Sequence, residues 1–216
     1  MDEMGKQIDA VSNQLTRLRV EFWADYTLFT WQWWMLVGVC IVMSILFITL
    51  LKKDKLLQSI AYFGVVFIIN KYLDDLATAL DWYDYRMQLN PIIPTMLTAN
   101  LFAVPMAITL VYQRFVRWKW FLLALGAFSF FLAYISLPLM KLVGMYQEKV
   151  WNSHLSFASL VVIAVIAKLI IDRIEIAQNV QRERKHHFTI HRHYRDEQLL
   201  VLFPFMRWFL RKEKTD

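Results

Sequence analysis

The sequence has few of the residues that cross-link a chain or bind phosphate tightly. Its 216 residues include one cysteine and five glycines. One cysteine excludes an intrachain disulfide, and Cys40 lies in an apolar run where packing is its expected role. No glycine-rich phosphate loop, serine-nucleophile elbow or His-Glu-x-x-His motif occurs, so the common enzyme signatures are missing. Residues 1–25 also lack the pattern of a cleavable signal peptide.

Polar residues are scarce as well, since 58% of the chain is hydrophobic and the mean hydropathy is +0.37. A soluble domain has about 45–50% apolar residues, whereas crossing a bilayer takes about 20 consecutive ones. Runs of that length predict an all-α integral membrane protein, a bundle of five transmembrane helices. The predicted spans are 31–51, 56–80, 92–112, 120–140 and 152–171.

Charge predicts the orientation of these spans, because Lys and Arg are retained in cytoplasmic links. The links after the first and third spans and the tail after residue 171 are rich in cations, and the links between them are poor. We therefore expect the N-terminus outside, the C-terminus in the cytoplasm and a multi-pass protein of the plasma membrane. The net charge of +6 is thus explained without nucleic acid.

Residues 1–30 carry a seam of apolar residues at alternating spacings of four and three. Its members are Met4, Ile8, Val11, Leu15, Leu18 and Phe22. This spacing predicts an amphipathic helix with a heptad stripe that must be buried. Three coverings stay open: the membrane interface, a second copy of the chain in a homo-oligomer, or packing within the chain.

The segment 172–216 is a basic tail, expected to be helical and cytoplasmic. Its stretch 199–210 is apolar and aromatic but too short to cross a bilayer, and flanking cations favour anchoring on anionic lipid, with a re-entrant element as the alternative. His187 and His191 have the i, i+4 spacing of a metal site. No carboxylate or thiolate completes the set, so a solvated basic face is the favoured interpretation.

The second predicted span ends in charged residues. Asn70, Lys71, Asp74 and Asp75 follow a clean apolar run near its outer edge. Helical spacing allows a Lys71–Asp75 ion pair and an Asn70–Asp74 hydrogen bond. Charges within a span often mark a functional site. A polar vestibule for a ligand or ion is therefore one hypothesis, and a solvated helix end with Lys71 reaching outward is the other.

Three further polar residues lie within predicted spans. Asn100, between Pro94 and Pro105, suits helix–helix hydrogen bonding or contact with a solute. His154 is a candidate partner of the acidic groups or a structural hydrogen-bonding residue. Lys168 is expected to extend to the cytoplasmic surface.

The link after the second span forms an acidic and aromatic patch on the outer side. It consists of Asp81, Trp82, Asp84 and Tyr85. The spacing of Asn70 and Asp74 is superficially like the magnesium motif of membrane prenyltransferases. Thr78 stands where the next carboxylate belongs, and no second acidic motif follows, so we expect no cofactor and favour a function without catalysis.

About half of the chain resembles a known family. The residues that carry the resemblance are Tyr72-Leu-Asp-Asp75, Asp81-Trp-Tyr-Asp-Tyr-Arg86, Pro91, Pro94, Pro105, Tyr112-Gln-Arg114, Trp118-Lys119, Gly144-Met-Tyr146 and Trp151. They are similar to the small, uncharacterised multi-helix membrane proteins of Bacillus, Clostridium and other spore-forming bacteria. The resemblance implies a bacterial plasma membrane and no particular reaction.

Three functions stay open from the sequence. The favoured one is a non-catalytic interaction or assembly protein of the membrane, which associates through the heptad seam. The second is a small transporter or channel that uses the outer vestibule, and the third is a lipid-modifying enzyme that uses Asp74 and Asp75.

Overall fold

The structure is a computed structural model that describes residues 2–93 and 95–202, with side chains described up to residue 178. The chain is mostly helical and divides into two compact units, Met1–Leu169 and Ile170–Asp216. All contacts discussed below lie within the first unit. The predicted segment 199–210 and the side chains of His187 and His191 lie wholly or largely outside the described part.

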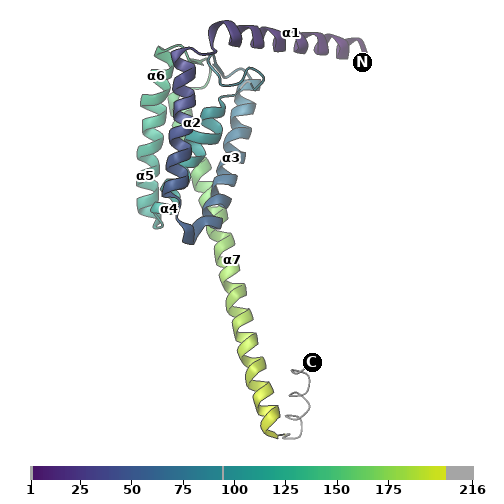
Figure 1. Ribbon diagram of the computed structural model, residues 1–216, viewed down its shortest axis with the longest axis vertical. Coiled ribbons are helices and arrows are strands. Elements are labelled where there is room, and N and C mark those ends of the chain that lie inside the picture. The colour runs from purple at the N-terminus through teal and green to yellow at the C-terminus, as the bar shows by residue number, and fades with distance from the viewer. Residues whose placement is uncertain (1, 94, 203–216) are drawn as a thin grey trace. The chain divides into compact units, whose positions relative to one another are not determined.

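The helices follow one another along the chain, and the two longest links between them each contain a short strand (Figure 1). They are α1 (Asp2–Tyr26), α2 (Trp31–Leu50), the 3₁₀ turn η1 (Lys53–Lys55), α3 (Leu56–Ala79), the π-helix η2 (Thr98–Ala103), α4 (Val104–Arg114), α5 (Trp118–Phe130), the π-helix η3 (Phe131–Ser136), α6 (Leu137–Leu142) and α7 (Ser153–Leu202).

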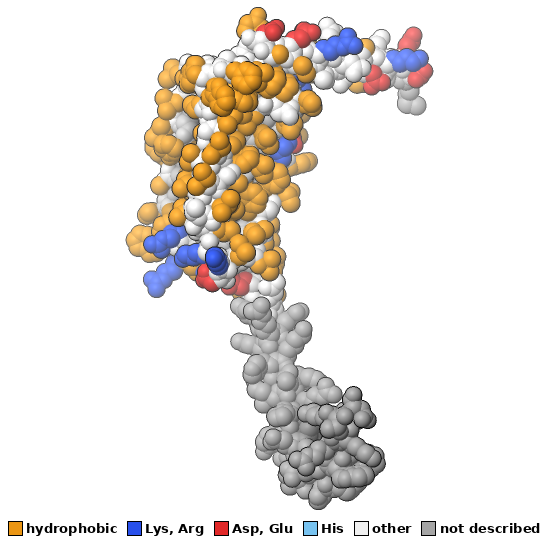
Figure 2. Space-filling view, in the orientation of Figure 1, with side chains coloured by type: hydrophobic (Ala, Val, Ile, Leu, Met, Phe, Trp, Pro, Cys, Tyr) orange, Lys and Arg blue, Asp and Glu red, His pale blue; other side chains and the backbone are white. Residues whose placement is uncertain are grey.

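Within the part of the chain that the structure describes, four helical stretches are long and apolar enough to cross a membrane. They are Trp31–Leu50, Lys53–Ala79, Trp118–Leu142 and Ser153–Gln178. Hydrophobic side chains cover most of the visible face of the helices that follow α1, and Lys and Arg side chains gather at the end farther from α1 (Figure 2). Apolar side chains on the outside of a helix bundle are expected where the bundle is surrounded by lipid hydrocarbon instead of water.

The prediction of an all-α fold is wrong in one respect, because two short strands pair. β1 (Tyr83–Tyr85) and β2 (Tyr146–Glu148) run antiparallel, with Tyr85 opposite Tyr146. Asp81 adopts φ +57° between α3 and β1, a left-handed conformation that aspartate tolerates better than most residues. Tyrosines favour strands, and the two links meet at one end of the bundle, which we term the strand end.

The prediction of a helix from residue 92 is also wrong. Helical structure begins only at Thr98, as a π-helix that continues into α4. Pro91 and Pro94 lack a backbone N–H, and proline disfavours helical backbone in the residue before it, which accounts for the absence of a helix from the described residues between β1 and Thr98. The resulting helix, Thr98 to Arg114, is shorter than the four candidate spans.

This short helix packs among the others. α4 contacts α2, α3 and α5, and η2 contacts α2 and α3. Ile108 and Thr109 are fully buried, and Thr98, Asn100 and Gln113 are nearly so. Because other helices surround it, this helix tolerates polar side chains that a lipid-facing helix would exclude.

Candidate functional site

A buried carboxylate lies at the strand end of the bundle. Asp74, on α3, is only 6% exposed. Its Oδ1 accepts hydrogen bonds from the hydroxyls of Tyr83 and Tyr85, at 2.5 and 3.0 Å. Its Oδ2 accepts one from Nδ2 of Asn100, at 2.5 Å. Three donors from two separate segments therefore converge on a single side chain of α3, which we term the Asp74 network.

Asn70 extends this network along α3. The helical spacing predicted a direct hydrogen bond from Asn70 to Asp74, and this prediction is wrong. Asn70 instead donates through Nδ2 to Oδ1 of Asn100 at 2.8 Å. Asn100 thus accepts from Asn70 and donates to Asp74, which orients its amide. It lies within the π-helix η2, a rare local geometry that is often found at functional sites.

The other carboxylates at this end are paired with cations. Lys71 pairs with Asp75, as predicted, Arg86 lies 3.3 Å from Asp84, and Lys149 pairs with Asp81. Within the described residues no Lys or Arg comes within ion-pair distance of Asp74. Asp74 is therefore held by neutral donors alone, and Lys71 points to a different partner.

The remaining predicted site residues lie outside the Asp74 network. His154 Nδ1 shares a hydrogen bond of 2.7 Å with the Tyr134 hydroxyl, which fits the structural role that was one of its two alternatives. Trp82 stacks on Trp151, with ring centroids 5.4 Å apart. Of the predicted patch, Tyr85 alone contacts Asp74. The structure thus separates residues that the sequence pattern grouped together.

The tyrosines of the two strands are expected to resist ionisation. Burial, reinforced by the charge of Asp74, raises the pKa of Tyr83 and Tyr85 well above the usual value. Burial, followed by the charge of Glu148, also raises the pKa of Tyr146. The hydroxyls of Tyr83 and Tyr85 therefore stay protonated and able to donate to Asp74.

These raised pKa values predict a loss of stability in alkali. The unfolded chain releases phenolic protons near pH ~10, while the folded chain keeps them, so the folded state binds more protons and is disfavoured as pH rises. We expect the melting temperature in detergent to be unaffected by these groups below about pH 10 and to fall above it. A melting temperature that stays constant from neutral pH into strong alkali would contradict this expectation.

A second polar cluster lies at the opposite end of the bundle, which we term the basic end. The Tyr62 and Tyr112 rings stack with centroids 3.9 Å apart. Tyr62 donates to the Ala164 carbonyl at 2.9 Å, and Gln58 donates to the Tyr112 hydroxyl at 2.8 Å. These contacts join α3, α4 and α7.

Lys168 belongs to this cluster, and the prediction that it extends to the surface is wrong. It is 2% exposed, and its Nζ lies 4.9, 5.0 and 5.4 Å from the ring centroids of Tyr112, Trp118 and Phe121. Aromatic faces attract an ammonium group through the ring quadrupole. This attraction and the surrounding helices hold the side chain inside the bundle.

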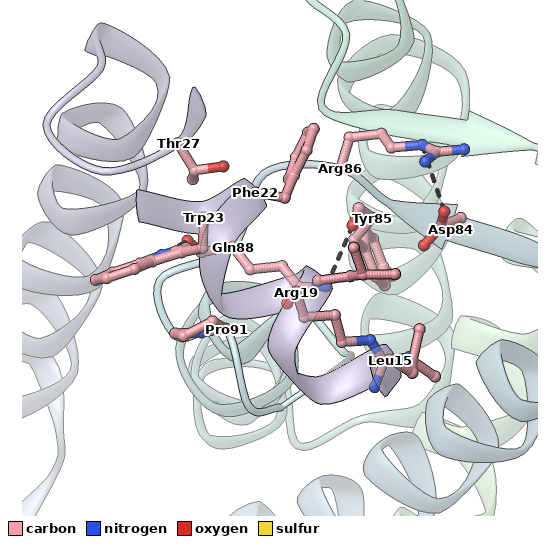
Figure 3. Close-up of a pocket in the computed structure, with 11 residues that line it drawn as sticks. Leu15, Arg19, Phe22, Trp23, Thr27, Asp84, Tyr85, Arg86, Gln88 and Pro91 are labelled. Atoms are coloured by element: carbon pink, nitrogen blue, oxygen red, sulfur yellow. Dashed lines mark hydrogen bonds and ion pairs between the residues drawn. The ribbon is translucent and has the colours of Figure 1, made fainter. Parts of the chain in front are cut away.

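A cavity of about 260 Å³ lies between α1 and the 84–91 segment, which comprises the end of β1 and the residues that follow it. Leu15, Leu18, Arg19 and Phe22 line it from α1, and Tyr85 and Pro91 are among the residues opposite (Figure 3). The Trp23 indole N–H donates to the Gln88 carbonyl at 3.0 Å and fixes α1 here. Because the Tyr85 hydroxyl also bonds Asp74, the cavity wall and the Asp74 network share a side chain.

The chemistry of the Asp74 network favours a structural role, in which Asp74 holds other segments against α3, over metal binding. Three N–H or O–H donors point at one carboxylate, and these donors occupy the oxygen positions that a cation would need. The network ties the strand pair, η2 and α3 together. Of its members, sequence reasoning missed Tyr83 as a ligand of Asp74, and the only local signal was the alternation of Tyr83 and Tyr85.

No family model, no curated protein and no solved structure matches the chain. The resemblance to membrane proteins of spore-forming bacteria therefore stays a prediction. The class that the fold defines is a mostly helical protein in which four stretches of the described residues are long and apolar enough to cross a membrane.

Proposed function

We propose that this chain is a non-catalytic assembly protein of a bacterial plasma membrane that associates with further copies of itself through α1. The observation that carries the proposal is the exposure of the heptad seam. All of its side chains are between 43% and 70% exposed. An apolar stripe of this length in water requires a covering partner, and a/d spacing is the pattern that a second helix covers.

The two halves of the seam differ in their surroundings. Leu15, Leu18 and Phe22 line the cavity over the 84–91 segment. Met4, Ile8 and Val11 are 64–70% exposed and are not among the residues that line this cavity. The first half is therefore the part that remains fully available to another chain.

The proposed topology has five crossings, with η2 and α4 as the central one. The helix from Thr98 to Arg114 is short, but the neighbouring helices α2, α3 and α5 shield it from lipid. The strand end faces outward in this topology, because the links at the basic end hold Lys52, Lys53, Arg114 and Arg117. Trp31 and Trp34, 59% and 56% exposed, suit the outer interface.

Charges placed on the free half of the seam test the proposal. Ile8→Glu combined with Val11→Glu is expected to convert an oligomer into a monomer, because it buries two like charges in any paired seam. The measurement is the mass of the purified full-length protein in detergent, by light scattering with the detergent contribution subtracted. The intramolecular contacts of Leu15 to Trp23 stay intact in this variant.

The control variant carries the same two charges on another face of α1. Asn13→Glu combined with Thr16→Glu has the same spacing and is expected to leave the oligomer unchanged, because neither residue belongs to the seam. A wild-type protein that is monomeric at all concentrations, or two variants that behave alike, would refute self-association through α1.

A small transporter or channel is the second candidate, and one observation favours it. Asp74 and Asn100 are both buried within helices that are proposed to cross the membrane. A carboxylate without a paired cation, such as that of Asp74, is unusual there. Against it, Lys71 does not share their surroundings. Cysteines at 74 and 100 that are protected from a membrane-impermeant thiol reagent, in a chain whose residue 81 cysteine reacts, would exclude a water-filled path.

A further inference from the structure

We propose that the cavity between α1 and the 84–91 segment binds the headgroup of an anionic phospholipid, with the Arg19 guanidinium on the phosphate. This inference depends on the membrane location and not on self-association. It concerns the second half of the heptad seam, which the assembly proposal leaves unused.

The walls of the cavity suit an amphipathic ligand. Leu15, Leu18 and Phe22 form an apolar side from α1, and Pro91 adds an apolar surface opposite (Figure 3). Arg19 enters the same space from α1. A phospholipid combines the same two properties, since its phosphate is charged and its first acyl carbons are apolar.

The charges around the cavity leave one cation without a partner. Arg86 lies 3.3 Å from a carboxylate oxygen of Asp84, and it donates to Gln147 Oε1 at 2.5 Å. Arg19 has no ion pair or hydrogen bond to any described residue, although it is partly buried. A guanidinium binds phosphate oxygens through paired N–H donors, so the unsatisfied group in the cavity is complementary to phosphate.

The position along the chain also suits a lipid headgroup. The cavity adjoins the last turns of α1, a few residues before α2 begins with exposed Trp31 and Trp34. Tryptophan concentrates at the level of the headgroups, where its ring meets hydrocarbon and its N–H meets water. The cavity therefore opens at the depth where phosphates lie. A free phosphate ion would leave the apolar walls unfilled.

The test measures lipid retained by the full-length protein. Protein delipidated in detergent is titrated with phosphatidylglycerol or phosphatidylcholine and examined by native mass spectrometry. We expect one tightly held phosphatidylglycerol per chain and weaker phosphatidylcholine. Arg19→Gln is expected to weaken phosphatidylglycerol binding by about tenfold or more, because it removes charge-assisted hydrogen bonds.

Arg17→Gln is the matched control, since Arg17 lies two residues away and does not line the cavity. It should leave the affinity within about twofold. Glycerol 3-phosphate, which has the phosphate without acyl chains, should fail to displace the lipid. If Arg19→Gln does not fold, Arg19→Lys keeps the charge, loses the paired donors and is expected to bind several-fold more weakly.

Several outcomes would overturn the proposal. They are equal losses in Arg17→Gln and Arg19→Gln, equal affinity for the two lipids, displacement by glycerol 3-phosphate at matched concentration, or an Arg19 variant that folds and binds like the wild type. Equal losses would mean a general attraction of the anionic lipid to the cations of α1. Displacement would identify the ligand as a free phosphate compound.

Discussion

Asp74→Leu is expected to lower the free energy of unfolding by about 3 kcal/mol or more. The substitution keeps a side chain of similar size but removes the acceptor of Tyr83, Tyr85 and Asn100. Each buried donor left without a partner costs about 1–3 kcal/mol. The measurement is the equilibrium unfolding of the purified protein in mixed micelles of increasing denaturing detergent.

Asp75→Leu is the control for this experiment. Asp75 is the next residue on α3, but its side chain is 48% exposed and pairs only with Lys71. An exposed ion pair contributes at most about 1 kcal/mol, so a small effect is expected. Asp74→Asn should fall between the two, since its carbonyl still accepts from the tyrosines while its amide opposes that of Asn100. Similar losses at positions 74 and 75 would show that the Asp74 network does not fasten the strand end.

Tyr112→Ala is expected to destabilise the basic end by about 3–5 kcal/mol, the usual cost of deleting a buried aromatic ring. The ring stacks on Tyr62 and forms one of the three faces around Lys168. Its loss opens a cavity between α3, α4 and α7 and removes part of the attraction that holds the ammonium group. The same unfolding measurement applies.

Tyr112→Phe separates the ring from its hydroxyl. It keeps the stacking and the cation–π contact and removes the hydroxyl that accepts from Gln58, so a loss of about 1 kcal/mol or slightly more, well below that of Tyr112→Ala, is expected. A loss as large as that of Tyr112→Ala would assign the stability of this end to the hydroxyl and would contradict the role given to the ring.

Much of the secondary structure was predictable because it depends on local chemistry. Long apolar runs became α2, α3 and the stretch from α5 to α6, which continues through Pro138, with boundaries within two residues of those expected. The Lys71–Asp75 pair was also predictable, because helical spacing alone brings it together. The third helix begins later than predicted because Pro91 and Pro94 disfavour helical backbone. This effect is local too, so the sequence alone could have indicated it.

The candidate site was only half predictable. Asp74 and Asn100 were recognised individually as unusual polar residues in apolar surroundings, but nothing in their spacing shows that they meet. Tyr83 reaches Asp74 because β1 folds back over the end of α3, and β1 exists because it pairs with β2, far away along the chain. Contacts that depend on the closure of long loops leave no periodic pattern in the sequence.

The sequence by itself determined that this chain forms long apolar helices, with Lys and Arg concentrated in particular links between them. The reason is that the length and apolarity of a helix suited to hydrocarbon are properties of its own residues. Only the tertiary structure decided which groups surround the buried charged side chains. Lys168 is enclosed by rings from α4 and α5, and Asp74 is capped by tyrosines from a paired strand. The physical reason is that the environment of a charge depends on which surfaces pack around it, and that packing involves residues distant in the chain.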